Sequence, residues 1–153
     1  MMDTVVGTRL SIRSLLRALD DGWQAYPAAM KALRPGDRQA YLAAQGYAEV
    51  RDLLAQATAW AEATLGVVPV LFQGGEVQRY DEDAFEAQAV ARFSFFSEAD
   101  VERRFTQAYA ALARLLALLP ERALTNPDVY EWLHATIVDR FNERRPPNLA
   151  PVP

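Results

Sequence analysis

The chain contains no cysteine and a single histidine, His134. Without thiols there can be no disulfide, no thiolate nucleophile, no cysteine-ligated zinc and no iron–sulfur cluster. A single imidazole also excludes a multi-histidine metal site, and any histidine-based catalysis must use this one residue. These two shortages remove many enzyme classes before any motif is considered.

Positive charge and long apolar runs are also scarce. The 16 Lys and Arg residues face 20 Asp and Glu residues, which gives a formal net charge of −4. Because proteins that bind nucleic acids or anionic membranes usually carry excess Lys and Arg, we expect neither partner. Among the longest apolar runs is the stretch 67–72, far below the roughly 20 residues of a membrane-spanning helix. The first residues have no basic region followed by a long apolar stretch, so we expect no secretory signal and a cytoplasmic protein.

What is present is a helical pattern, and no strand pattern of any length accompanies it. Apolar residues recur every three to four positions in four long segments, at about 8–33, 48–72, 97–119 and 127–145. Pro27 is expected to kink or end the first of these, and a shorter periodic segment lies at 85–96. The two long connections, about 34–47 and 73–83, leave room for at least one crossover. The pattern predicts an all-α fold, a single four-helix-bundle domain over 1–153 with a short extra helix before the third long one.

Capping signals mark the predicted helix starts. Ser97 is followed three residues later by an acid, and Asn126 stands directly before Pro127, a proline suited to the first helical position. The acidic stretch 80–83 suits the positive end of a helix dipole. A proline pair ends the last helix, and we expect the tail 148–153 to be either frayed or packed as an extended arm.

The second predicted helix carries a recognisable motif. In the segment 46–60, a glycine–aromatic pair is followed by a short spacer, by the run Arg-Asp-Leu-Leu-Ala and by a tryptophan four residues after Gln56. This stretch resembles the second-helix signature of the DinB-like superfamily, and it is particularly close to the ClbS/DfsB branch. The segment 80–88, together with Trp132 and Phe141-Asn142-Glu143 in the last helix, resembles the same branch. The resemblance covers nearly the whole chain in element order and implies a four-helix bundle of up-down-down-up topology, commonly a homodimer.

The resemblance also locates a metal site that this chain has altered. Many superfamily members hold a divalent metal with three histidines, one on the second helix and two spaced four apart on the last. Here Gln56, Arg140 and Arg144 stand at those positions. Glutamine is a poor ligand for zinc or nickel, and arginine stays protonated and does not ligate. We therefore predict no metal site and no cofactor.

Three residues are candidates for catalysis: Asp52, Gln56 and His134. Asp52, Gln56 and Trp60 follow one another at intervals of four on one ridge of the second helix. Asp52 is either a general base or an ordinary acid paired with an arginine, and Gln56 either lines a pocket or points its amide to solvent. His134 falls in the apolar stripe of the last helix, where it is either a proton donor and acceptor or a satisfied core or interface residue.

The candidate ligand-binding residues are Trp60, Tyr130, Arg140 and Arg144. The two arginines lie four apart on the core-facing edge of the last helix, so they need either carboxylate partners or an anionic or carbonyl group of a ligand. Asp52, Glu49 or a partner subunit could supply the carboxylates, or the arginines could simply occupy a solvated helix end. Trp132, on the opposite face of that helix, is expected at a dimer interface or under a covering loop.

Three functions compete at this point. The first is a metal-free DinB-like protein with a small-molecule pocket between its helices. The second is a non-catalytic bundle that works by dimerisation or partner binding and derives from a metal-dependent ancestor. The third and least favoured is a metal enzyme with an oxygen-rich carboxylate site, because the Glu-x-x-His motif of the di-iron bundles is missing.

Overall fold

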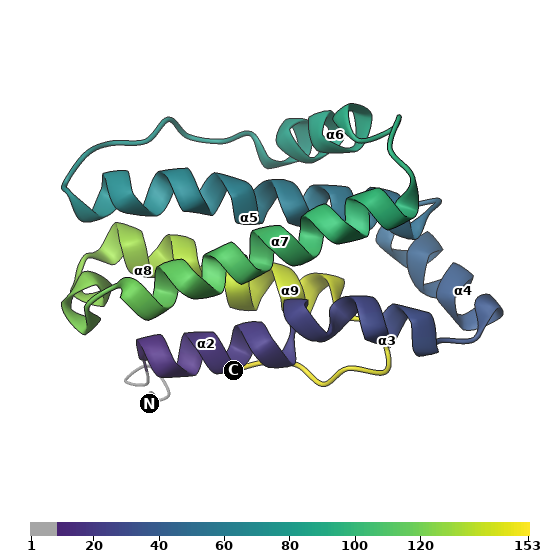
Figure 1. Cartoon of the computed structure of the whole chain (residues 1–153), viewed down its shortest axis with the longest axis horizontal. Helices are drawn as coiled ribbons and strands as arrows, with labels where there is room; N and C mark the ends of the chain where they lie inside the picture. Colours follow the sequence, from purple (N-terminus) through teal and green to yellow (C-terminus); the bar gives the residue numbers. More distant parts are fainter. Residues whose placement is uncertain (1–8) are drawn as a thin grey trace.

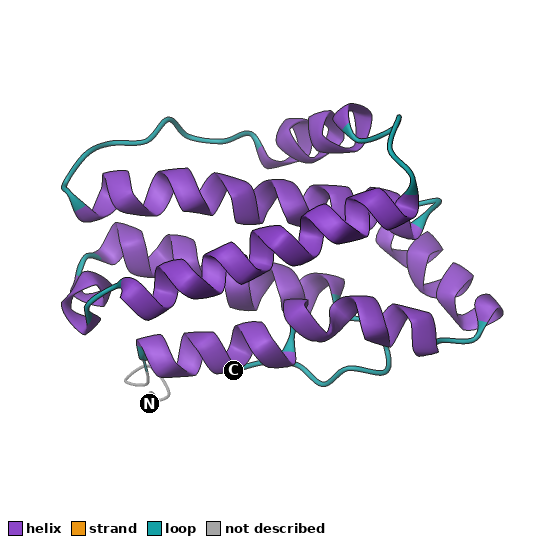
Figure 2. Cartoon of the chain, in the orientation of Figure 1, coloured by secondary structure: helices purple, strands orange, loops and turns teal. Residues whose placement is uncertain are grey.

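The computed structural model describes residues 9–153, which form helices joined by loops and turns and contain no strand (Figure 2). The all-α prediction is therefore confirmed for this range. Thr8, the predicted start of the first helix, lies outside the described residues. The α-helices are α2 (Ile12–Asp21), α3 (Tyr26–Ala32), α4 (Pro35–Gln45), α5 (Val50–Phe72), α6 (Glu82–Arg92), α7 (Glu98–Leu118), α8 (Pro127–His134) and α9 (Arg140–Arg144). Tighter 3-10 turns occupy Trp23–Ala25 and Glu121–Thr125, and one π-helical turn spans Ala135–Asp139.

The three predicted helix starts are capped as the sequence indicates. The side chain of Asp81 accepts a hydrogen bond of 3.2 Å from the amide three residues on. Ser97 does the same at 3.1 Å. Asn126 accepts from the two amides that follow Pro127, at 3.0 and 3.3 Å. Each cap satisfies a backbone donor that has no partner inside its helix.

The first long helix breaks at Gly22. The prediction that Pro27 kinks or ends this helix is therefore wrong, because the break comes five residues earlier. A Cβ atom on Gly22 would lie 2.9 Å from the carbonyl oxygen of Ala18 and 3.1 Å from the ring of Phe141. The last helical segment can therefore approach this turn closely only because the residue is a glycine. Pro27 lies in the first turn of α3, where its missing N–H costs no helical hydrogen bond.

The segment 34–47 is not the polar connection that the sequence indicated, because most of it forms α4. Pro35 begins this helix, and Gly46 ends it in the left-handed conformation with φ of 84°. Tyr41 and Leu42 turn inward and are buried. A proline–glycine pair such as Pro35-Gly36 is typical of a turn, but proline is also favoured in the first turn of a helix, as here.

The helices pack lengthwise around α5, with α4 across one end (Figure 1). Helix α5 contacts α6, α7 and α8, and α2 packs against α7. Aromatic rings fill the space between α2, α3, α7 and α9, with centroids 4.6 to 6.3 Å apart. This aromatic core consists of Trp23, Tyr26, Phe105, Tyr109 and Phe141.

Helix α5 is also the one helix among residues 9–153 that is long and apolar enough to cross a membrane. In the structure 67% of its most apolar window is buried by the rest of the chain. That burial is consistent with the central core helix of a soluble protein.

The chain after α9 is an extended arm packed on the helices, so the frayed alternative is wrong. The side chain of Asn142 holds Val152 from both sides, donating to its carbonyl oxygen and accepting from its amide, both at 2.9 Å. Asn148 donates to the carbonyl oxygen of Ala29 at 2.9 Å. Val152 is buried as a result.

Candidate functional site

Helix α5 and the segment from α8 to α9 lie antiparallel and face a common groove. The indole N–H of Trp132 donates to Thr64 Oγ1 at 2.9 Å, and the guanidinium of Arg140 lies 3.7 Å from the ring centroid of Trp60. Residue numbers rise along one segment as they fall along the other, which fixes the antiparallel register. The loop 73–81 runs across the opening between them.

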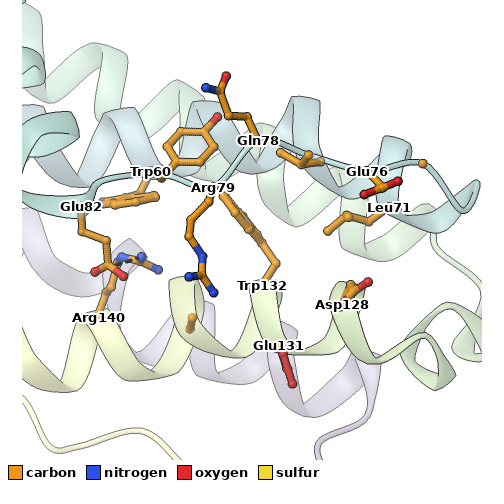
Figure 3. A pocket seen from close by; sticks show the side chains of 14 residues that line it. Trp60, Leu71, Glu76, Gln78, Arg79, Glu82, Asp128, Glu131, Trp132 and Arg140 are labelled. Atoms are coloured by element: carbon orange, nitrogen blue, oxygen red, sulfur yellow. Dashed lines mark ion pairs between the residues drawn. The ribbon is translucent and has the colours of Figure 1, made fainter.

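The groove has a volume of about 720 Å³ and an aromatic floor (Figure 3). The rings of Trp60, Tyr80 and Trp132 contact one another, with centroids 5.4 to 6.2 Å apart. Tyr80 comes from the loop, so the loop covers Trp132, which is half-buried within its own chain. Of the two alternatives for Trp132, the structure shows the covering loop.

Arg140 lies at the edge of this floor with much of its bonding capacity unused. One of its terminal nitrogens lies 3.4 Å from Glu82 Oε1, at the first turn of α6. Its Nε atom is buried and has no hydrogen-bond partner among the described residues. The side chain is only 15% exposed, whereas that of Glu82 is 66% exposed. Apart from its stacking on Trp60, this mostly buried guanidinium has a single long ion-pair contact, with an exposed carboxylate.

Arg144, one helical turn further on, is fully engaged. It donates to Glu86 Oε1 at 3.1 Å, and to the carbonyl and side-chain oxygens of Gln45 at 3.2 and 3.1 Å. The other oxygen of Glu86 accepts the indole N–H of Trp60 at 2.8 Å. Glu86 therefore joins α5, α6 and α9 through one carboxylate.

A cluster of tyrosines contacts the backbone at Arg144. The hydroxyls of Tyr26 and Tyr41 lie 2.7 Å apart, and that of Tyr41 also donates to the carbonyl oxygen of Arg144. Burial raises the pKa of Tyr41 to about 12 and raises the pKa of Tyr26 further. Burial also raises the pKa of Tyr47. These phenols stay neutral near pH 7 and cannot act as bases there.

Neither of the two catalytic candidates on α5, Gln56 and Asp52, lines the groove. Gln56 is only 1% exposed, so the alternative of a solvent-facing amide is wrong, and it does not line the groove either. Its Nε2 atom is buried without a partner among the described residues. Asp52 is half-buried and lies 3.4 Å from Arg51, its neighbour in sequence, as an ordinary arginine-paired acid does.

The structure places His134 and Tyr130 apart from the groove. The hydroxyl of Tyr130 accepts from the amide of Leu10 at 2.9 Å, and Arg9 covers its ring at 3.9 Å. His134 stacks on Tyr130 and its Nδ1 lies 3.2 Å from Asp139 Oδ2. His134 is partly exposed at the edge of the apolar stripe, and neither residue lines the groove. The three catalytic candidates therefore do not form one constellation.

The sequence did not reveal which carboxylates pair with Arg140 and Arg144. It also did not reveal that a third arginine, Arg79, lines the groove. The expected partners Asp52 and Glu49 pair with Arg51 instead. The actual partners, Glu82 and Glu86, lie one turn apart on α6, matching the spacing of the arginines. That matching i, i+4 spacing was the available signal. Arg79, in the loop, gave no signal of its own, because an isolated loop arginine is usually solvated.

The side chains at the superfamily's metal positions do not suit a metal. Gln56 offers one amide oxygen, and the two arginines are cations held by carboxylates. Residues 9–153 contain no group of three histidine, cysteine or acidic side chains arranged to hold a metal ion.

No family model, no curated protein and no solved structure matches the chain. Function must therefore be argued from the groove and its contacts.

Proposed function

We propose that this chain is a metal-free DinB-like protein of the ClbS/DfsB type that binds a small molecule in the groove of Figure 3. In this proposal the long helices form a four-helix bundle of up-down-down-up topology, with α6 as the extra helix, in a cytoplasmic protein. The motif in residues 46–60 and the order of the helices support the assignment.

The observation that carries the binding function is the state of Arg140. Its Nε–H is buried and has no acceptor among the described residues, and its guanidinium lines an open groove with an aromatic floor. Ligand sites typically combine apolar walls with a few polar groups that fix orientation. Because the ion-pair contact of this guanidinium is long, a ligand acceptor at its terminal nitrogens would be favoured.

The proposal assigns binding and no reaction. Asp52, Gln56 and His134 do not meet, and none of them lines the groove. General acid–base catalysis needs such a group within hydrogen-bond reach of the reacting atom.

The test uses 2-naphthalenemethanol, a flat neutral probe, and isothermal titration calorimetry. We expect measurable binding to the native chain and its loss in Ala135→Trp, since Ala135 lines the groove and a tryptophan would fill it. Ala117→Trp, at an exposed position of α7, is the matched control and should bind normally. A native chain that does not bind, or an Ala135→Trp variant that binds as well as native, would contradict the proposal.

A second function, association with another copy of the chain, is favoured by two adjacent exposed aromatic side chains. Phe95 and Phe96, between α6 and α7, are 94% and 38% exposed. Exposed apolar groups that lie next to one another often mark contact surfaces. Sedimentation equilibrium should detect a dimer that Phe95→Ser weakens. A monomeric native chain would contradict this second function.

A further inference from the structure

Two guanidinium groups from different elements reach the same end of the groove. Arg140 comes from α9, and Arg79 comes from the covering loop and extends into the groove beside it (Figure 3). Arg79 is exposed, and none of the ion pairs or hydrogen bonds found among residues 9–153 uses its side chain. Among the described residues, Arg79 thus has no ion-pair or hydrogen-bond partner for its side chain, and Arg140 has one long ion-pair contact.

The group that now occupies Arg140 is a carboxylate, and it is weakly held. Glu82 makes one contact of 3.4 Å and is mostly solvated. Ion pairs at the protein surface contribute roughly 0–1 kcal/mol, and since the carboxylate of this pair is exposed and its contact is long, a competing carboxylate can replace it at little cost. Glu82 shows which chemical group this position accepts.

The acidic residues of the groove limit where an anion could lie. Glu76 and Asp128 line the groove near Leu71, away from the two arginines (Figure 3). The groove is lined by two basic side chains, Arg79 and Arg140, and by four acidic ones, Glu76, Glu82, Asp128 and Glu131. An anion therefore gains nothing from the overall charge of the groove. It is favoured only at the arginine end, where direct contact with the guanidiniums is available.

We propose that the ligand is a flat apolar carboxylate whose carboxylate lies between Arg79 and Arg140 in place of Glu82. Its apolar part covers the aromatic floor over Trp132. This inference rests on the proposed binding function and adds the chemical class of the ligand. Arginine suits the role because its planar fork matches a carboxylate and its face stacks on an aromatic ring, as Arg140 does on Trp60.

The test compares 2-naphthoate with the neutral 2-naphthalenemethanol by calorimetry. We expect 2-naphthoate to bind about tenfold more tightly, the effect of one good charged hydrogen bond. Arg79→Gln and Arg140→Lys should each remove most of that difference between the acid and the alcohol. Arg114→Gln, at an exposed position on α7, makes the same charge change as Arg79→Gln outside the groove and should have no effect.

The most diagnostic variant is one that gains affinity. Glu82→Gln removes the competing carboxylate, so it should tighten 2-naphthoate binding several-fold. Glu86→Gln makes the same chemical change one turn away and should not tighten binding, because Glu86 holds Arg144 and Trp60. Circular dichroism confirms that each variant is folded before its affinity is compared.

The outcomes separate this inference from the function on which it rests. Equal affinity for acid and alcohol would overturn the carboxylate class and leave the groove as a binding site. Tight binding of 2-naphthoate that neither arginine variant weakens would also overturn the inference. Failure of both probes to bind would overturn the proposed function together with it.

Discussion

Two ion pairs one helical turn apart join the same two helices, and they differ in almost every physical respect. Arg144 and Glu86 lie 3.1 Å apart and are 24% and 16% exposed, and each makes further hydrogen bonds. Arg140 and Glu82 lie 3.4 Å apart, Glu82 is 66% exposed, and a buried nitrogen of Arg140 has no partner among the described residues. The same arginine–glutamate pattern thus links the helices firmly at Arg144. One turn earlier, at Arg140, it leaves a hydrogen-bond donor without an acceptor among the described residues.

The difference follows from what surrounds each pair. At the Arg144 end, Gln45 and Tyr41 of α4 and Tyr47, which follows α4, contact Arg144 and give it further partners. At the Arg140 end, the neighbour is the groove. A charged group next to an open groove keeps bonding capacity that a ligand can use.

The largest expected effect is on stability, from Glu86→Ala. This change leaves the guanidinium of Arg144 and the indole N–H of Trp60 without their shared acceptor, and we expect it to lower the free energy of unfolding by about 2–3 kcal/mol. Glu82→Ala should cost under about 0.5 kcal/mol, because Glu82 is exposed and makes one long contact with Arg140. Urea denaturation measures both. Equal losses from the two variants would remove the distinction between the pairs.

Tyr41→Phe should weaken the Arg144 end by a smaller amount. The hydroxyl of Tyr41 bonds both Tyr26 and the carbonyl oxygen of Arg144, so its removal should cost about 1–2 kcal/mol. The affinity of the groove for 2-naphthalenemethanol should not change, since the groove is at the other pair. A variant as stable as the native chain would show that the tyrosine cluster does not support this end.

Alkaline pH should lower the free energy of unfolding, because the tyrosines next to Arg144 ionise. Burial raises the pKa of Tyr41 to about 12 and raises that of Tyr26 as well, whereas unfolded tyrosines ionise near 10. The stabilisation is therefore complete below about pH 10 and declines as the pH rises toward 12, by at most about 1.4 kcal/mol per pH unit for each proton. Urea denaturation between pH 9 and about 11.5 measures the decline, with tyrosinate absorbance as an independent probe. Normal tyrosine ionisation in the folded chain would contradict this account.

The smallest expected effect is the coupling between Glu82 and Arg140. A double-mutant cycle with alanine at both positions should give under about 0.5 kcal/mol, and about 1 M NaCl should abolish it. The same cycle at Glu86 and Arg144 should give a larger coupling that salt reduces little. A strong, salt-resistant coupling at the first pair would mean that Glu82 is a structural partner and not a replaceable one.

Local signals predicted much of the fold. The caps at Asp81, Ser97 and Asn126 depend on the few residues that follow them, so the sequence alone located three helix starts. The close approach of the Phe141 ring to Gly22 joins residues far apart in the chain, and no local pattern reveals it. Helix α4 was missed because a proline–glycine pair is ambiguous between a turn and a helix start.

The candidate site was predictable only in part. The sequence singled out Trp60, Arg140 and Arg144 through the resemblance to a metal-binding family, and the structure brings these three together. Their partners on α6 come from a helix that the resemblance said little about. Arg144 has more hydrogen-bond acceptors than Arg140 because α4 supplies Gln45. The sequence pattern did not predict α4.

The central claim is that Arg140 binds the ligand's carboxylate in place of Glu82. A crystal structure of the native chain with 2-naphthoate tests it most directly. The account predicts the carboxylate between Arg79 and Arg140, the ring over Trp132, and Glu82 turned to solvent while Glu86 still joins Trp60 and Arg144. A structure in which Glu82 remains on Arg140 and the naphthoate lies elsewhere would contradict it.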